Sequence, residues 1–224
     1  MNDLQKNDVP ATNQVKQSVF IHENSGIRIL FAGNSITKHS PRPAMGWLSD
    51  CGMAASDIDH DYVHLLLEKI REYDKNVAWA IAQVGEHETN LLNGAKPADR
   101  YSEAADFNAD IIVMFYGANT PKEYDTMEKA PRTFGSAYEE MRCFLDKSSK
   151  SKVIHCQGFY VRPRLEAEKQ AICDKYGDTW VSLGNIGTRK DTHGRFNHPN
   201  DLGMQIIADS IWKRLQELIK EILF

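Results

Sequence analysis

Short apolar runs alternate with amphipathic stretches from residue 27 to the end of the chain. Five runs are nearly continuous in apolar residues, as expected of strands buried on both faces: 27–32, 77–82, 110–116, 152–156 and 179–183. Helical periodicity predicts helices between and after them, near 57–73, 98–107, 134–149, 164–176 and 201–222. Strand and helix therefore alternate, which is typical of a parallel sheet whose crossover helices cover both faces.

This order predicts an α/β fold, a three-layer α/β/α sandwich around a five-stranded parallel sheet with flavodoxin-like topology. Residues 1–26 form a polar tail that ends in a candidate edge strand at 18–21, and residues 27–224 form one domain. The irregular stretches 38–56 and 117–133 both follow strands. Because ligands bind at the carboxyl ends of strands in such sheets, we expect the site there. Ser56 is the expected N-cap of the first long helix.

Composition narrows the range of partners. The chain carries 27 basic and 31 acidic residues without a basic stripe, which argues against nucleic acid. The longest apolar run is far shorter than a membrane span, and the polar N-terminus does not resemble a signal peptide. The sequence as it stands indicates a cytoplasmic protein, or a secreted or periplasmic one if a leader has been removed. No metal or cofactor is expected, because the cysteines are scattered and the His60/His64 pair is best explained as a solvated helix face.

Three short motifs fall where the predicted topology brings chain segments together. FAGNSIT places Ser35 after the first strand, FYGANT places Gly117 and Asn119 after the third, and FNHPND places His198 in a loop before the last helix. Each motif alone is compatible with an ordinary turn, because Gly, Asn and Ser dominate turns. Their joint order favours a catalytic serine served by a histidine base and an amide donor.

These motifs resemble three conserved blocks of the SGNH (GDSL-like) hydrolases, from residue 27 to the C-terminus. The resemblance implies that Ser35 is the nucleophile, His198 the general base and Asn119 a donor to the oxyanion. A glycine of the second block completes that oxyanion hole in the family. Gly85 is the best positional match, and Gly52 is the competing one.

Two positions depart from the family pattern. Asn34 replaces the usual aspartate of the first block, and Arg195 stands where the last block usually has the aspartate that orients the histidine. Two alternatives follow: a Ser35–His198 dyad, or a triad completed by the upstream carboxylate of Asp191.

The expected activity is hydrolysis of a small carboxylic ester through an acyl-enzyme, with an O-acetylated carbohydrate favoured among the family's substrates. Further residues are expected to contact the substrate: Asn34, Trp47, Glu86, Tyr116 and Arg195. Two alternatives stay open, a non-catalytic or weakly active carbohydrate-binding protein on the same fold and a lysophospholipase-type lipid esterase. The sequence does not indicate an oligomeric state.

Overall fold

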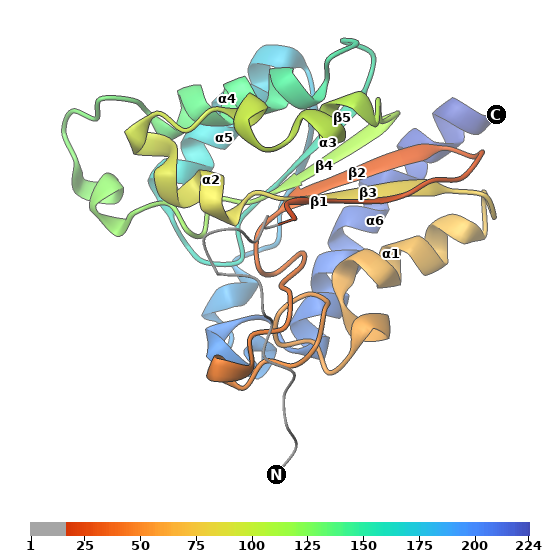
Figure 1. Ribbon diagram of the computed structural model, residues 1–224, viewed down its shortest axis with the longest axis horizontal. Helices are drawn as coiled ribbons and strands as arrows, with labels where there is room; N and C mark the ends of the chain where they lie inside the picture. The colour runs from red at the N-terminus through yellow and green to blue at the C-terminus, as the bar shows by residue number, and fades with distance from the viewer. Residues whose placement is uncertain (1–16) are drawn as a thin grey trace, which may run out of the picture.

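The computed structural model describes residues 17–224, and its centre is a six-stranded sheet with the strand order β1-β3-β2-β4-β5-β6 (Figure 1). The strands are β1 (Val19–His22), β2 (Arg28–Gly33), β3 (Ala78–Gln83), β4 (Ile111–Phe115), β5 (Lys152–Cys156) and β6 (Thr179–Val181). Strands β2 to β6 are parallel, which confirms the predicted five-stranded arrangement and its flavodoxin-like order. The sixth strand, β1, joins antiparallel to β3 at the edge. Residues 1–16 of the predicted tail lie outside the described residues.

Helices cover both faces of the sheet and make the three layers visible in Figure 1. They are α1 (Tyr62–Arg71), α2 (Gly85–Asn90), α3 (Ser102–Asp106), α4 (Phe134–Leu145), α5 (Pro163–Tyr176) and α6 (Asp201–Leu223). Helices α1 and α6 pack together on one face, and α3, α4 and α5 lie on the other. The short helix α2, at the carboxyl end of β3, has no counterpart among the predicted helices.

The first long helix begins later than predicted. The structure divides the stretch into a 3₁₀ turn, Ile58–His60, and α1. Asp57 caps the turn, and Asp61 caps α1 by accepting a hydrogen bond from the His64 backbone N–H at 2.9 Å. Ser56 is therefore not the N-cap, because the two carboxylates accept the free N–H groups in its place.

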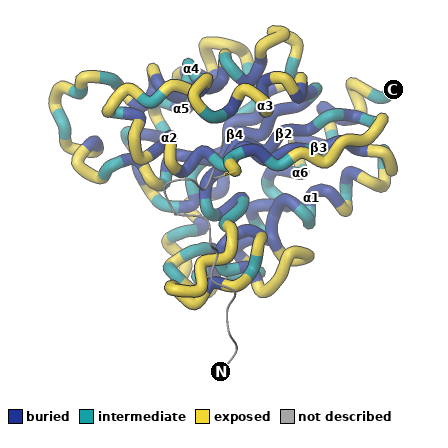
Figure 2. Tube along the Cα trace, in the orientation of Figure 1, coloured by how far each residue is buried: buried dark blue, intermediate teal, exposed yellow. Residues whose placement is uncertain are grey.

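The side chains of β2 show why the sheet is covered on both sides. Ile29 and Phe31 belong to the core cluster that also contains α1 and α6, whereas Leu30 and Ala32 belong to the cluster beneath α4. Alternate residues of a strand point to opposite faces, so the uninterrupted apolar residues 29–32 require an apolar layer on each side of the sheet. Figure 2 shows the resulting buried strands between partly exposed helices.

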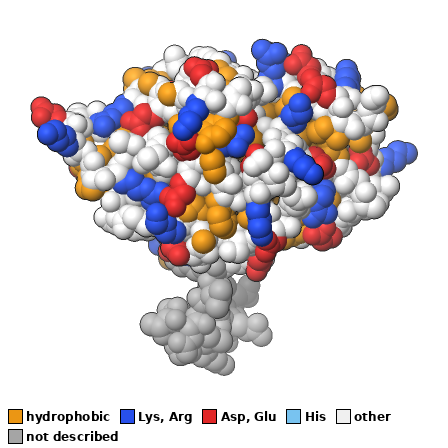
Figure 3. Space-filling view, turned by 90° about the horizontal axis from the view of Figure 1, so that it is seen from above, with side chains coloured by type: hydrophobic (Ala, Val, Ile, Leu, Met, Phe, Trp, Pro, Cys, Tyr) orange, Lys and Arg blue, Asp and Glu red, His pale blue; other side chains and the backbone are white. Residues whose placement is uncertain are grey.

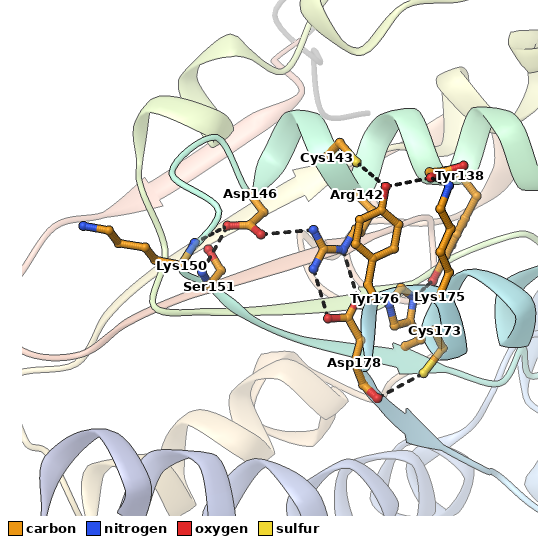
Figure 4. A network of polar contacts seen from close by, with 12 residues as sticks. Tyr138, Arg142, Cys143, Asp146, Lys150, Ser151, Cys173, Lys175, Tyr176 and Asp178 are labelled. Carbon is orange, nitrogen blue, oxygen red and sulfur yellow. Dashed lines mark hydrogen bonds and ion pairs between the residues drawn. The ribbon is translucent and has the colours of Figure 1, made fainter.

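A buried polar network fastens α4 to β5 and to the start of β6 (Figure 4). The Tyr138 hydroxyl lies 2.9 Å from Nδ1 of His155, whose Nε2 lies 2.9 Å from the Asp178 carboxylate. Arg142 donates two hydrogen bonds to Asp178, at 2.9 and 3.0 Å, and one to Asp146 at 3.1 Å. Each charged group has an opposite partner, so this network stabilises the back of the sheet.

Two loops far apart in sequence lie side by side at the lower end of the molecule in Figure 1. They are the stretch after β2 and the stretch before α6. Arg195 donates to the Gly46 carbonyl at 3.1 Å, and the Ser56 N–H donates to Asp201 at 2.7 Å. These contacts bring the histidine loop against the serine loop.

The surface agrees with the mixed charge of the sequence. On the face shown in Figure 3, basic and acidic side chains are interspersed rather than gathered by sign. Among residues 17–224, no helix combines the length and apolar character that a membrane span requires. The same residues hold no group of three or more side chains placed to ligate a metal ion.

Candidate active site

The turn that carries Ser35 leaves the carboxyl end of β2 in the middle of the sheet. It folds back sharply, because the N–H groups of Thr37 and Lys38 both donate to the Asn34 carbonyl, at 2.9 and 3.0 Å. A Cβ atom at Gly33 would lie 1.7 Å from the Thr37 hydroxyl oxygen, so the turn requires glycine there. The backbone thereby presents Ser35 at the mouth of the crevice, half-buried.

Ser35 and His198 meet although 163 residues separate them in sequence. Their Oγ and Nε2 atoms lie 2.7 Å apart, and Nδ1 of His198 lies 2.8 Å from the Phe196 carbonyl oxygen. A carbonyl can only accept a hydrogen bond, so Nδ1 carries the proton and Nε2 is free to accept one from Ser35. This is the tautomer that a general base needs.

An unusual backbone places that carbonyl. Phe196 and Asn197 have φ angles of 57° and 58°, in the left-handed region that non-glycine residues rarely adopt. The two residues turn the chain so that the Phe196 carbonyl faces the ring of His198, two positions further on. Such strain is typical of functional sites, where the surrounding structure holds it in place.

The environment favours the neutral form of the histidine. Burial lowers the pKa of His198 below its ordinary value, and the nearby charge of His39 lowers this pKa further. The hydrogen bond to the Phe196 carbonyl opposes this shift in the pKa without reversing it. His198 is therefore ready to accept a proton at neutral pH.

Neither charged residue considered for the last block contacts the His198 ring. Asp191 is exposed and pairs with Arg189, with 2.6 Å between a carboxylate oxygen and Nη2. Arg195 extends across to the Gly46 carbonyl. Within the part of the chain that the structure describes, the acceptor at Nδ1 is a backbone carbonyl, which is the geometry of the dyad alternative.

The structure distinguishes the two candidate glycines. Gly85 is the first residue of α2, and an added Cβ would lie 3.2 Å from Nδ2 of Asn119, so these two predicted oxyanion donors are neighbours. Its N–H donates to Oε1 of Gln83 at 3.0 Å. The Gly52 N–H is instead buried and donates to Asp61 at 3.0 Å. The geometry therefore favours Gly85.

The residues expected to contact substrate lie in different surroundings. Trp47 and Tyr116 are only 4% and 3% exposed, so neither ring offers a free face. Trp47 packs edge-on against Phe196, at 6.5 Å between ring centroids, and Tyr116 packs among aromatic residues of the core. Arg195 is exposed at the histidine loop.

Glu86 is exposed and lies 2.5 Å from Arg100 as an ion pair. It lines a cavity of about 650 Å³ beside the serine loop. Most of the other lining side chains are polar or charged, among them Lys38, His39, Arg42, Asp50 and Gln83. The cavity can therefore offer many hydrogen bonds to a ligand.

Three residues of the site, Gln83, Glu88 and Phe196, are not among the site residues that the sequence predicts. Glu88 was recognisable only as one of several polar residues after the second apolar run. The signal that could have separated Glu88 from its polar neighbours is the start of a short helix at Gly85. Residues 85 and 88 lie on one face of such a helix, whereas Glu86 points elsewhere. The carbonyl of Phe196 has no signal in the sequence.

Comparisons with known proteins support the fold. A two-domain esterase active on acetylated mannans superimposes with a TM-score of 0.60 at 18% identity, over 87% of this chain and 50% of the other. A family two carbohydrate esterase from Clostridium thermocellum gives 0.61 at 14%, over 88% and 65%. A putative GDSL-like lipase from Bacteroides ovatus gives 0.54 at 13%, over 86% and 100%.

The chain therefore has the fold of the SGNH/GDSL hydrolases, as the sequence motifs predicted. It spans about half to two thirds of the length of the carbohydrate esterases that it matches. No family model and no curated protein matches the sequence.

Proposed function

We propose that this chain is a serine esterase that hydrolyses small carboxylic esters, with O-acetylated carbohydrates as the substrate class. The observation that carries the proposal is the 2.7 Å contact between Ser35 Oγ and His198 Nε2 at the carboxyl edge of the sheet. Gly85 and Asn119 lie together at the same edge. A nucleophile, a base of the right tautomer and candidate oxyanion donors are the parts that acyl transfer requires.

In the proposed reaction, His198 accepts the Ser35 proton as the oxygen attacks the ester carbonyl. The oxyanion accepts hydrogen bonds from the Ser35 and Gly85 N–H groups and from the Asn119 amide, the Gly85 donor exchanging its bond to Gln83. His198 then protonates the leaving alcohol, and a water molecule hydrolyses the acyl-enzyme by the reverse route. The Phe196 carbonyl stabilises the imidazolium less than a carboxylate would, so this dyad is slower than a full triad.

Two observations support a carbohydrate leaving group. The cavity beside the serine loop, which Lys38, His39 and Gln83 help to line, is bordered largely by polar and charged side chains, which suit a hydroxyl-rich alcohol better than an acyl chain. A protein of the same fold is active on acetylated mannans. In this proposal Asn34 holds the turn, Trp47 supports the histidine loop, and Glu86, which lines the cavity, lies nearest the bound alcohol, whereas Arg195 bonds to the Gly46 carbonyl and does not line the cavity.

Labelling with a serine-directed fluorophosphonate, together with turnover of p-nitrophenyl acetate and acetylated sugars, tests the proposal. Ser35→Ala should abolish labelling and turnover with little change in melting temperature, because the hydroxyl is at the mouth of the site. Ser210→Ala is the matched control, since that hydroxyl only bonds to the Ile206 carbonyl on α6. A wild-type protein that is neither labelled nor active contradicts the proposal and favours the non-catalytic binding protein.

A further inference from the structure

Glu88 is a carboxylate buried at the centre of the site without a cationic partner. Its side chain lies on α2 and is 0% exposed. Among residues 17–224, no lysine, arginine or histidine forms an ion pair with it, whereas many other acids of the chain have one. A buried charge is costly unless it is paired or fully hydrogen-bonded, so the surroundings of this group need an explanation.

The carboxylate is held by N–H donors from two different strand ends. Its Oε1 accepts from Nδ2 of Asn34 at 3.1 Å and from the Gly117 backbone N–H. Its Oε2 accepts from Nδ2 of Asn119 at 2.8 Å. One side chain on α2 thus connects the turn after β2, which carries Ser35, to the turn after β4, which carries Asn119.

An ionised carboxylate fixes how both amides are oriented, because it can only accept hydrogen bonds. Asn119 must turn its NH₂ group toward Glu88, and the second hydrogen of that group is left to donate elsewhere, beside Gly85. Asn34 must do the same, which leaves its Oδ1 to accept from the Ile36 N–H at 3.1 Å. That bond holds the turn around Ser35.

On the basis of the esterase function proposed above, we propose that Glu88 is a positioning residue that aims the Asn119 amide at the oxyanion and holds the Ser35 turn through Asn34. This role of Glu88 also accounts for the asparagine at position 34, where the family pattern has aspartate. An aspartate at that position would bring two carboxylates within hydrogen-bond distance. In this chain the carboxylate is on α2, and residue 34 is the amide that it requires.

Three variants test the pairing: Glu88→Gln, Asn34→Asp and the double variant. In Glu88→Gln the shape is kept, but only one oxygen remains; it stays with the Asn34 amide and the Gly117 N–H, and the new NH₂ group faces the NH₂ group of Asn119, which therefore turns. We expect kcat on p-nitrophenyl acetate to fall about 10²-fold, with KM within about threefold of wild type. Asn34→Asp alone should lose at least as much. The kcat of the double variant should be about tenfold higher than that of the less active single variant, because one carboxylate and one amide face each other again.

Asp146→Asn separates positioning from general stability. Asp146 is also buried and accepts several hydrogen bonds, but it belongs to the network of Figure 4. The Asp146→Asn variant should have a lower melting temperature than wild type, with kcat per folded molecule unchanged. The proposal is overturned if Glu88→Gln behaves like Asp146→Asn, or if the double variant recovers nothing.

A measurement that does not depend on turnover keeps this proposal distinct from the esterase proposal. The side-chain amide signals of Asn34 and Asn119 in ¹⁵N–¹H NMR spectra, assigned by Asn→Asp variants, should shift in Glu88→Gln. If the wild type hydrolyses no ester, the proposed function fails, but shifted amide signals still support the positioning of Asn34 and Asn119 by Glu88. Unchanged amide signals in Glu88→Gln overturn the proposed role of Glu88, whatever the esterase activity of the wild type.

Discussion

The network of Figure 4 and the cluster around Glu88 each hold a carboxylate out of water, but they satisfy it with different partners. Asp178 faces the guanidinium of Arg142 and the ring of His155, whereas Glu88 receives only uncharged N–H groups. Burial alone would raise the pKa of Asp178, but hydrogen bonds from His155 and Arg142 and their charge bring this pKa below its ordinary value. Burial raises the pKa of Glu88, and hydrogen bonds from Gly117, Asn34 and Asn119 oppose that rise only in part.

The difference teaches what each cluster is suited for. In the network of Figure 4 the Arg142 guanidinium is paired with the carboxylates of Asp178 and Asp146, and these ion pairs fix α4 to the sheet. Around Glu88 the donors are side-chain amides and a backbone N–H. Each amide keeps a second hydrogen that Glu88 does not accept, and these groups lie beside Ser35. The first cluster should therefore govern stability, and the second should govern catalysis.

The largest effect is expected from Asp178→Asn. The change leaves Arg142 and His155 buried without their shared partner, and breaking a buried pair of this kind costs about 3–5 kcal/mol of unfolding free energy. Urea denaturation measures the loss, with the exposed Asp174→Asn on α5 as the neutral control. The kcat per folded molecule should not change, and a loss of kcat with unaltered stability would contradict the division between the two clusters.

Asn119→Ala should give the opposite result. Removing one oxyanion donor costs about 10²–10³ in kcat, because the bond forms fully only in the transition state. The free energy of unfolding should fall less than in Asp178→Asn, because Glu88 loses one N–H donor but keeps those from Asn34 and Gly117. Asn90→Ala is the control, because it removes an exposed amide that bonds to the Glu86 carbonyl on α2. A loss of less than a few-fold in kcat would rule out Asn119 as a donor.

The acid side of the pH profile tests the surroundings of His198. Catalysis needs the neutral ring, and burial lowers the pKa of that ring below its ordinary 6.5, so the acid limb of the kcat/KM profile should have its midpoint below pH 6.5. His39→Gln removes a positive charge that lowers this pKa, so the midpoint should move to higher pH. A midpoint above 6.5 in the wild type would show that an anion, and not burial, dominates at the ring.

The smallest effect is expected from Asp191→Asn. Its carboxylate is exposed and bonds to Arg189, so kcat/KM on one ester substrate should stay within about threefold of wild type. His198→Ala, measured beside it, should remove nearly all turnover because the base is lost. If Asp191→Asn lost activity on the scale of His198→Ala, the dyad would be replaced by a triad with a displaced carboxylate.

The sequence by itself determined the layered α/β fold and the order of its parallel strands. Residues 29–32 are apolar without interruption, and such a strand is stable only between two helical layers. The sequence also indicated Ser35, Asn119 and His198 as candidates, because parallel strands end at one edge and all three motifs follow or adjoin those ends. These inferences rest on local patterns that any chain of this fold must repeat.

Only the tertiary structure decided how the candidate residues are oriented. The acceptor at His198 is a backbone carbonyl, which no side-chain motif can reveal, and it depends on the positive φ angles of two non-glycine residues. The central role of Glu88 depends on the short helix α2, whose first residues look like a polar loop. Trp47 and Tyr116 are buried because packing, and not proximity in sequence, decides which aromatic faces stay open. Hydrogen-bond direction and burial are properties of contacts between distant segments, and the sequence pattern does not contain them.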